Sequence, residues 1–159
     1  MTNPKNPTHI VVDPDVPLVR ITREFDAPAA QVFRAHTDPE LFAQWNGPRS
    51  RTMTTDHFDC RTGGSYRYVL TADGHDAAFR GCFHEVRPDE LIVQIFTYEG
   101  MPDGVALERL AFEDLGGGRT RLTATSLVDS FADRDMFVAS GMESGVREGY
   151  EQLDELLAR

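Results

Sequence analysis

Between residues 53 and 127 the chain consists of strand-like stretches that are separated only by short turns. The six stretches are Met53–Phe58, Ser65–Thr71, Ala77–Val86, Glu90–Tyr98, Val105–Leu115 and Arg119–Leu127. Turn signals such as Asp73-Gly74 and Gly116-Gly117-Gly118 stand between them. Parallel neighbours need a crossover of about a dozen residues or more, so connections this short require antiparallel pairing. The pattern therefore predicts one antiparallel meander.

A further strand and two short helices are expected before this meander. Leu18–Phe25 alternates apolar and polar residues, which is the period of a half-buried strand. Asp26 can cap a first helix that has Pro28 in its first turn. Asp38-Pro39 begins a second helix, Glu40–Trp45, which ends before Gly47. The two helices are expected to form a V-shaped pair.

After the meander, the pattern predicts one long helix from a cap at Asp133 to about Ala158, roughly 39 Å at about 1.5 Å per residue. This helix carries Gly141, Gly145 and Gly149, with a spacing of four that places them on one face. Each interior glycine costs roughly 1 kcal/mol relative to alanine, so the series needs a structural reason. Two reasons stay open: close packing of helix on sheet, or space for a ligand.

The order of elements predicts the fold class. One strand, two short helices, six strands and a long helix correspond to an α+β helix-grip fold, in which an antiparallel sheet of about seven strands wraps around the C-terminal helix. The 159 residues suit one domain. Residues 1–17 contain four prolines and are expected to form a flexible N-terminal arm, and residues 18–159 the domain itself.

Composition excludes several classes of partner. The formal net charge is −10, and the 16 basic residues are scattered singly, so a nucleic-acid surface is not expected. No stretch approaches the roughly 20 apolar residues of a membrane span, and no signal peptide is evident. Cys60 and Cys82 form no C-x-x-C pair and are expected as free thiols in the cytoplasm. The histidines lack ligand spacing, so we expect no metal. We also expect no cofactor.

Several local strings resemble one protein family when their order and spacing are taken together. They are Ile21–Pro28 (ITREFDAP), Thr37–Leu41 (TDPEL) with Trp45 and Gly47-Pro48, Asp59–Arg67 (DCRTGGSYR), Gly81–Glu85 (GCFHE) and Gly141–Gly145 (GMESG). The chain resembles bacterial proteins similar to the C-terminal domain of the activator of heat shock protein 90 ATPase homologue, within the START and birch-pollen-allergen-like (SRPBCC) superfamily. The resemblance covers about residues 18 to 158. It implies a helix-grip fold and a hydrophobic tunnel between sheet and helix, and it implies no single activity.

Aromatic side chains on the expected inner faces of the strands are the main candidates for the tunnel wall. On 79–86, Phe83 shares a face with Phe79 and Gly81, while Tyr66 and Tyr68 form the equivalent face of a neighbouring strand. Gly81 in mid-strand indicates a bulge or the close approach of another group. Further candidates share an expected position in the same interior: Trp45, Phe96, Phe112, Met142 and Gly145. For each of them, plain core packing is the alternative.

Among charged residues, Glu85 is the candidate for an interior group, because it has the same parity as Phe83. If it is buried, it needs a partner such as Arg67 or Arg109. Asp59 and Arg61 flank a turn and are expected to form a local charge pair.

Three functions remain open from the sequence. The first is the binding of a small hydrophobic molecule in the tunnel, without catalysis. The second is a cyclase, dehydratase or hydrolase working in the same cavity, which the lack of a convincing acid–base pair weakens. The third is a co-chaperone-like ATPase-activator interaction module. The expected partner is a small hydrophobic molecule, and a second copy of the chain, in a homodimer, stays an open alternative.

Overall fold

The computed structural model describes residues 6–159, in which eight strands form one sheet of antiparallel neighbours. Across the sheet the order is β1-β2-β8-β7-β6-β5-β4-β3. The strands are β1 (His9–Val12), β2 (Leu18–Phe25), β3 (Thr52–Phe58), β4 (Ser65–Ala72), β5 (His75–Arg87), β6 (Leu91–Tyr98), β7 (Ala106–Gly116) and β8 (Arg119–Leu127). From β3 to β8 every strand pairs with the next one in the chain, which confirms the predicted meander.

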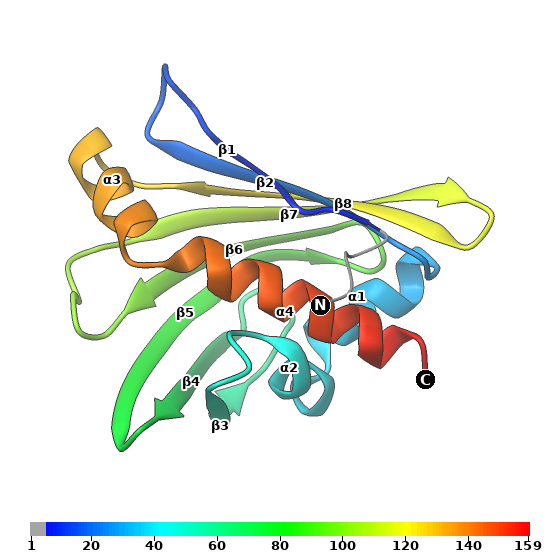
Figure 1. Ribbon diagram of the computed structural model, residues 1–159, viewed down its shortest axis with the longest axis horizontal. Coiled ribbons are helices and arrows are strands. Elements are labelled where there is room, and N and C mark those ends of the chain that lie inside the picture. The colour runs from blue at the N-terminus through cyan, green and yellow to red at the C-terminus, as the bar shows by residue number, and fades with distance from the viewer. Residues whose placement is uncertain (1–5) are drawn as a thin grey trace.

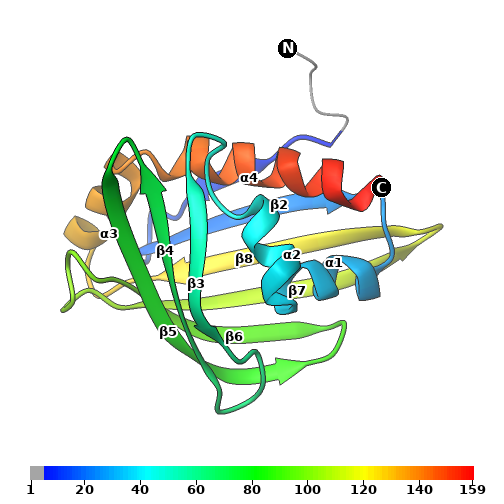
Figure 2. The same cartoon turned by 90° about the horizontal axis from the view of Figure 1, so that it is seen from below.

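Four helices within residues 6–159 lie against this sheet: α1 (Ala29–Thr37), α2 (Pro39–Trp45), α3 (Phe131–Ala139) and α4 (Met142–Leu157). The sheet is strongly curved, and α4 runs along its hollow side (Figures 1 and 2). The Asp38 carboxylate accepts a hydrogen bond from the Glu40 amide (3.0 Å) and so begins α2 directly after α1. This arrangement confirms the α+β helix-grip prediction, with one strand more than expected.

The additional strand lies in the segment that was predicted to be a flexible arm. His9–Val12 pairs with β2 at the edge of the sheet, and the Arg147 guanidinium donates to the Thr8 carbonyl (2.7 Å). The strand has only four residues, and Ile10 is the one that is less exposed than its neighbours. An alternation this short does not indicate a strand in a segment rich in proline. The structure therefore corrects the prediction for residues 6–17, and the rest of the expected arm, residues 1–5, lies outside the described residues.

The prediction of one long final helix is wrong, because the chain forms two helices in this region. Gly141 has φ +87° and stands between α3 and α4. A glycine in this left-handed conformation is a common way to end a helix, since a Cβ is disfavoured there. The second helix has 16 residues and spans about 24 Å. Gly141 therefore ends α3 and is not a member of an interior glycine series.

Two expected helix caps also differ. Pro28 occupies the cap position of α1 without a side-chain hydrogen bond, and Asp26 instead pairs with Arg119 (3.2 Å). The Ser130 hydroxyl caps α3 by accepting from the amide of Asp133, the residue expected as the cap (3.1 Å).

The inner face of α4 packs closely on both α2 and the sheet. A Cβ on Gly149 would lie 3.1 Å from the Trp45 carbonyl oxygen, so this glycine permits close contact with the end of α2. Tyr150 meets Phe25 edge-on, with 5.5 Å between ring centroids. Leu153 is fully buried. At Gly149 the contacts thus support close packing, the first of the two reasons considered for the glycine series. The neighbour is the end of α2 and not the sheet.

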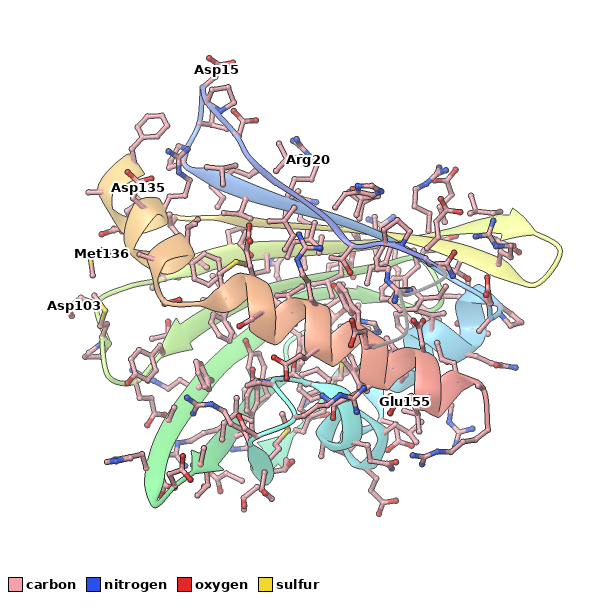
Figure 3. All side chains as sticks on the ribbon, viewed as in Figure 1. Asp15, Arg20, Asp103, Asp135, Met136 and Glu155 are labelled. Atoms are coloured by element: carbon pink, nitrogen blue, oxygen red, sulfur yellow. The ribbon has the colours of Figure 1, made fainter. Side chains whose placement is uncertain are left out.

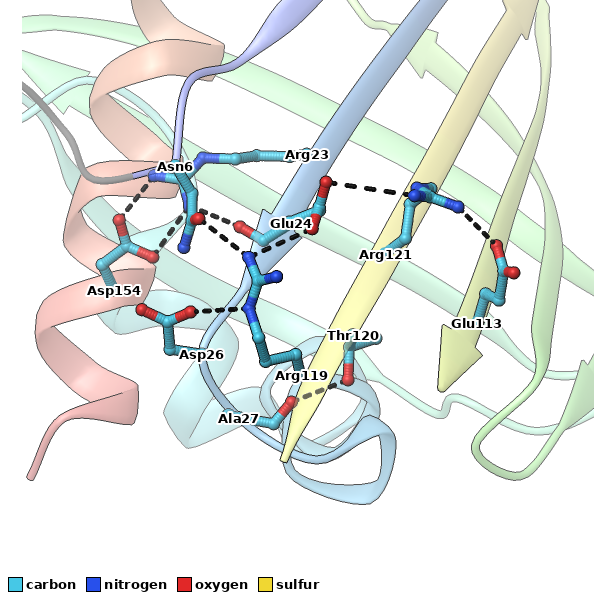
Figure 4. Close-up of polar contacts among 10 residues, drawn as sticks. All are labelled: Asn6, Arg23, Glu24, Asp26, Ala27, Glu113, Arg119, Thr120, Arg121 and Asp154. Atoms are coloured by element: carbon cyan, nitrogen blue, oxygen red, sulfur yellow. Dashed lines mark hydrogen bonds and ion pairs between the residues drawn. The ribbon is translucent and has the colours of Figure 1, made fainter. Parts of the chain in front are cut away.

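An ion pair fixes α4 to β2 at the same place. Arg23 is 1% exposed, and its guanidinium makes two contacts with Asp154, at 3.0 and 2.5 Å (Figure 4). Towards the strand ends, Arg119 joins Glu24 and Asp26 in a more exposed network. A buried arginine on the inner face of β2 therefore connects this strand directly to α4.

By contrast, α3 has no buried residue. It lies at the end of the molecule that also carries Asp103, in the β6–β7 connection, and Asp15, in the β1–β2 connection (Figure 3). Its Met136 is 51% exposed. Within residues 6–159, no helix has the length and apolar character needed to cross a membrane.

Candidate functional site

The hollow face of the sheet is incompletely covered at its centre. The residues there share a half-buried state and inward-facing positions on the three central strands: Gln94 and Phe96 on β6, Glu108 and Leu110 on β7, and Ala124 on β8. Positions of this kind are usually fully buried in a sheet that a helix covers. The helices therefore leave these side chains partly exposed.

Beside this region, a cavity of about 40 Å³ lies between the first two helices and the sheet. Its walls are largely aromatic and consist of His36, Phe42, Phe58, Tyr66, Tyr68, Phe83, Ile92, Gln94 and Leu110. A water molecule needs roughly 10–15 Å³ of such volume, and ligand sites typically span about 300–1,000 Å³. The cavity can therefore hold a small group but not the body of a ligand.

Tyr66 and Tyr68 line this cavity, and their rings stack with 6.0 Å between centroids. The Tyr66 hydroxyl donates to the Ile95 carbonyl of β6 (2.8 Å) across Gly81 of β5. A Cβ on Gly81 would lie 2.7 Å from that hydroxyl and 1.7 Å from the same carbonyl oxygen. The mid-strand glycine thus gives the tyrosine room to cross β5, which is the close approach that the sequence indicated.

His36, near the end of α1, is a cavity residue that the sequence analysis missed. Its Nδ1 lies 2.8 Å from the Val32 carbonyl, and its ring meets Trp45 and Phe112 edge-on, at 4.7 and 5.1 Å between centroids. Burial lowers the pKa of His36 to about 4, so the imidazole is neutral at pH 7. The helical pattern of Val32, Phe33 and Ala35 could have indicated its inward position, one turn after Val32.

A row of polar side chains crosses the hollow face from β6 to β8. The Glu108 carboxylate accepts from the Gln94 amide (2.9 Å) and from the Ser126 hydroxyl (2.6 Å). Burial raises the pKa of Glu108, and the two hydrogen bonds partly offset this. The sequence analysis chose Glu85 and missed Glu108, although alternation with Ala106 and Leu110 places Glu108 on the inner face.

Glu85 does not face the interior, and a β-bulge is the reason. Phe83 pairs with Gln94, but Glu85 pairs with Val93, so the register shifts by one residue between them. The shift turns Glu85 to the outer face, where its side chain is 40% exposed and its carboxylate accepts from the Thr62 hydroxyl (3.0 Å). Even alternation along the strand predicts the opposite face.

Among the other candidates, Phe83 lines the cavity and Phe96 stacks on Phe79 beside it (5.3 Å). Phe112 is buried against Phe33 (5.4 Å). Trp45 is buried and donates from its indole N–H to the Ala35 carbonyl (2.8 Å). These contacts place Trp45 and Phe112 in the packed core that supports His36.

Met142 and Gly145 lie on α4, outside the small cavity. Met142 is half-buried and packs against the core. A Cβ on Gly145 would meet only Pro48, at 3.6 Å, which is an ordinary contact. Gly145 therefore faces the loop after α2, and its role in a ligand site stays a prediction.

Comparison with solved structures shows the same fold in other bacterial proteins. A protein from Rhodobacter sphaeroides is 28% identical, with a TM-score of 0.84 over 94% of this chain and 97% of its own. One from Arthrobacter aurescens is 27% identical, with a TM-score of 0.87 over 94% of this chain and 91% of its own. One from Mycobacterium smegmatis is 24% identical, with a TM-score of 0.86 over 95% and 97%, and shows the fold alone.

Among curated proteins, none matches this sequence. The family model described as "Activator of Hsp90 ATPase homolog 1-like protein" matches residues 26–158, from the end of β2 to the end of α4. This match includes both short helices, the whole meander and both C-terminal helices. The resemblance seen in the sequence is thereby confirmed, and the chain belongs to the family of activator of Hsp90 ATPase homolog 1-like proteins.

Proposed function

We propose that this protein binds a small hydrophobic molecule between the hollow face of its sheet and the C-terminal helices. The observation that carries the proposal is the half-buried state of Phe96, Leu110 and Ala124 at the centre of that face. Apolar side chains that stay partly uncovered inside a grip of this kind offer an apolar ligand area to bury.

The chemistry of the walls agrees with this proposal. Aromatic and aliphatic side chains predominate, and a few polar groups lie among them, notably His36, Gln94 and Glu108. Small-molecule sites usually combine a largely apolar lining with few polar groups that fix orientation. Because the cavity has a volume of only about 40 Å³, the body of the ligand would lie over the central strands and only one small group would enter the cavity.

Family membership alone assigns no activity, because one fold supports many functions. A cyclase- or hydrolase-type reaction and a co-chaperone-like interaction therefore stay alternatives. The cytoplasmic location and a homodimer also stay predictions.

Two alanines of neighbouring strands provide a matched test. Ala124 faces the hollow side next to Leu110, and Ala111 is exposed on the outer side of β7. We expect Ala124→Phe to fill the space over the central strands and to weaken the binding of Nile red at least tenfold, while Ala111→Phe leaves binding unchanged. Nile red is chosen because it is neutral, and a net charge of −10 would repel an anionic dye.

Fluorescence titration gives the affinity, and thermal unfolding shows that each variant stays folded. Equal affinity in both variants would contradict the proposed position of the ligand. Native mass spectrometry of the freshly purified protein complements the titration. A retained mass of a few hundred daltons that is lost in Ala124→Phe would identify the class of the natural occupant.

A further inference from the structure

His36 presents one hydrogen-bonding atom to the interior, and its chemical state follows from its neighbour. The Val32 carbonyl oxygen, 2.8 Å from Nδ1, can only accept, so Nδ1 carries the proton. In the neutral imidazole Nε2 is then an acceptor with a free lone pair. Nδ1 points back to the helix backbone, so Nε2 lies on the far side of a ring that belongs to the wall of the cavity.

Within residues 6–159, no protein group donates to this nitrogen. The His36 residue is 5% exposed, and Nε2 is buried without a hydrogen-bond partner. Two donors around it are used elsewhere: the indole of Trp45, whose ring meets His36 edge-on, donates to the Ala35 carbonyl, and the Tyr66 hydroxyl on the cavity wall donates to the Ile95 carbonyl. A buried acceptor without a partner is costly, and native proteins rarely retain one without a reason.

We propose that His36 Nε2 is the atom that selects the ligand, by accepting a hydrogen bond from a hydroxyl group on an otherwise apolar molecule. The inference rests on the proposed function and adds the class of ligand to it. The hydroxyl would enter the cavity of about 40 Å³, and the apolar body would lie over the central strands.

The size and the hydrogen-bonding capacity of the cavity favour a hydroxyl over an ammonium group. A hydroxyl brings one donor, which matches the one free acceptor on His36, whereas an ammonium brings three donors and a full charge. Moving a charge into aromatic surroundings carries a large desolvation cost. The Glu108 carboxylate does not line the cavity, and it already accepts hydrogen bonds from Gln94 and Ser126. The cavity also holds a water-sized group, so a bound water on Nε2 is the competing explanation.

Phenol and toluene test the proposal, because they differ by a hydroxyl in place of a methyl group of similar size. With ¹⁵N-labelled histidine, the Nε2 resonance of His36 is expected to shift on addition of phenol, in the direction of a hydrogen-bonded acceptor. Toluene should bind without this shift. The measurement uses the unaltered protein and needs no substitution.

A variant pair then measures the contribution of the nitrogen. His36→Phe keeps an aromatic ring and removes the acceptor, and His84→Phe makes the same change at an exposed position of β5. We expect His36→Phe to weaken phenol binding by roughly three- to tenfold and toluene binding by less than about twofold, since a neutral hydrogen bond contributes on this order. His84→Phe should change neither affinity.

Each remaining outcome decides against one of the two proposals. If phenol and toluene bind and His36→Phe weakens both equally, or if neither shifts Nε2, then the nitrogen holds only water and this inference is overturned while apolar binding stands. If neither compound binds, the proposed function itself is overturned, and the inference fails with it.

Discussion

At the scale of single residues, the ion pair between Arg23 and Asp154 is the contact with the largest expected energetic consequence. Arg23 is 1% exposed, so little water reaches its guanidinium. Asp154 compensates the buried positive charge, and the Glu24 carbonyl oxygen accepts a hydrogen bond from Nη1 (2.8 Å). Removing one partner of a buried pair leaves an uncompensated charge and typically costs about 3–5 kcal/mol.

Adjacent carboxylates of α4 allow this cost to be measured against an exposed pair. Asp154→Ala should lower the free energy of unfolding by about 3 kcal/mol, at the lower end of the range because Asp154 itself is 35% exposed. Glu155→Ala breaks the exposed pair with Arg49 (2.5 Å) and should cost less than about 1 kcal/mol. Urea denaturation of both variants checks this, and equal costs would show that burial of Arg23 does not matter.

Some residue positions could be predicted and others could not. Asp59 and Arg61 form the expected pair, with 2.8 Å between Nε and Oδ2. Tyr66 and Phe83 follow even alternation from the starts of their strands and so face inward, where they line the cavity. Glu85 does not follow even alternation, because a β-bulge precedes it. The bulge arises from the pairing of β5 with β6 and cannot be predicted from the sequence of either strand alone.

At the scale of elements, the glycines of the C-terminal region have opposite structural reasons. Gly141 has φ +87° and open space around its missing Cβ, so only its backbone conformation requires glycine. Gly145 has ordinary helical geometry and only Pro48 nearby. Sequence spacing treats the two alike, which is why one long helix was predicted in place of α3 and α4.

Alanine substitution at each position should therefore have opposite signs. Gly141→Ala forces an L-residue into the left-handed region and should lower the free energy of unfolding by about 1–2 kcal/mol. Gly145→Ala gains helix propensity without a clash and should raise it by up to about 1 kcal/mol. Thermal and urea unfolding measure both. A stabilising Gly141→Ala would show that α3 and α4 can join into one helix.

At the scale of the whole molecule, β1 forms the edge of the sheet next to β2. Ile10 packs against the core, and Arg119 donates to the Asn6 side chain (3.1 Å). Deleting residues 1–13 removes these contacts and uncovers the edge of β2, so we expect the melting temperature to fall by more than about 5 °C, or roughly 1–2 kcal/mol.

Two single substitutions separate the contribution of the β1 side chains to stability from the effect of shortening the chain. Ile10→Ala should reproduce part of the loss, because this side chain is half-buried. Val11→Ala should have little effect, because Val11 is 51% exposed. If the deleted protein melts within about 2 °C of the full chain, β1 contributes only marginally to stability.

The overall architecture could be predicted from connection lengths alone. Short turns from β3 to β8 leave antiparallel neighbours as the only arrangement, and the bounds of β2 and β8 match their alternating stretches. The edge strand could not be predicted, because a four-residue stretch acquires its structure from pairing with β2. The extent to which the helices cover the sheet could not be predicted either, because it depends on how all the elements pack together.

The bulge in β5 also determines which change in length this strand can tolerate. Phe83 and Val86 both face inward because His84 is the extra residue between the pairs Phe83–Gln94 and Glu85–Val93. Losing or gaining one residue at a regular position would turn every later side chain of the strand to the opposite face. Losing His84 would instead restore regular pairing and keep Phe83 and Val86 inside. Relatives one residue shorter at this point can thus preserve the same interior.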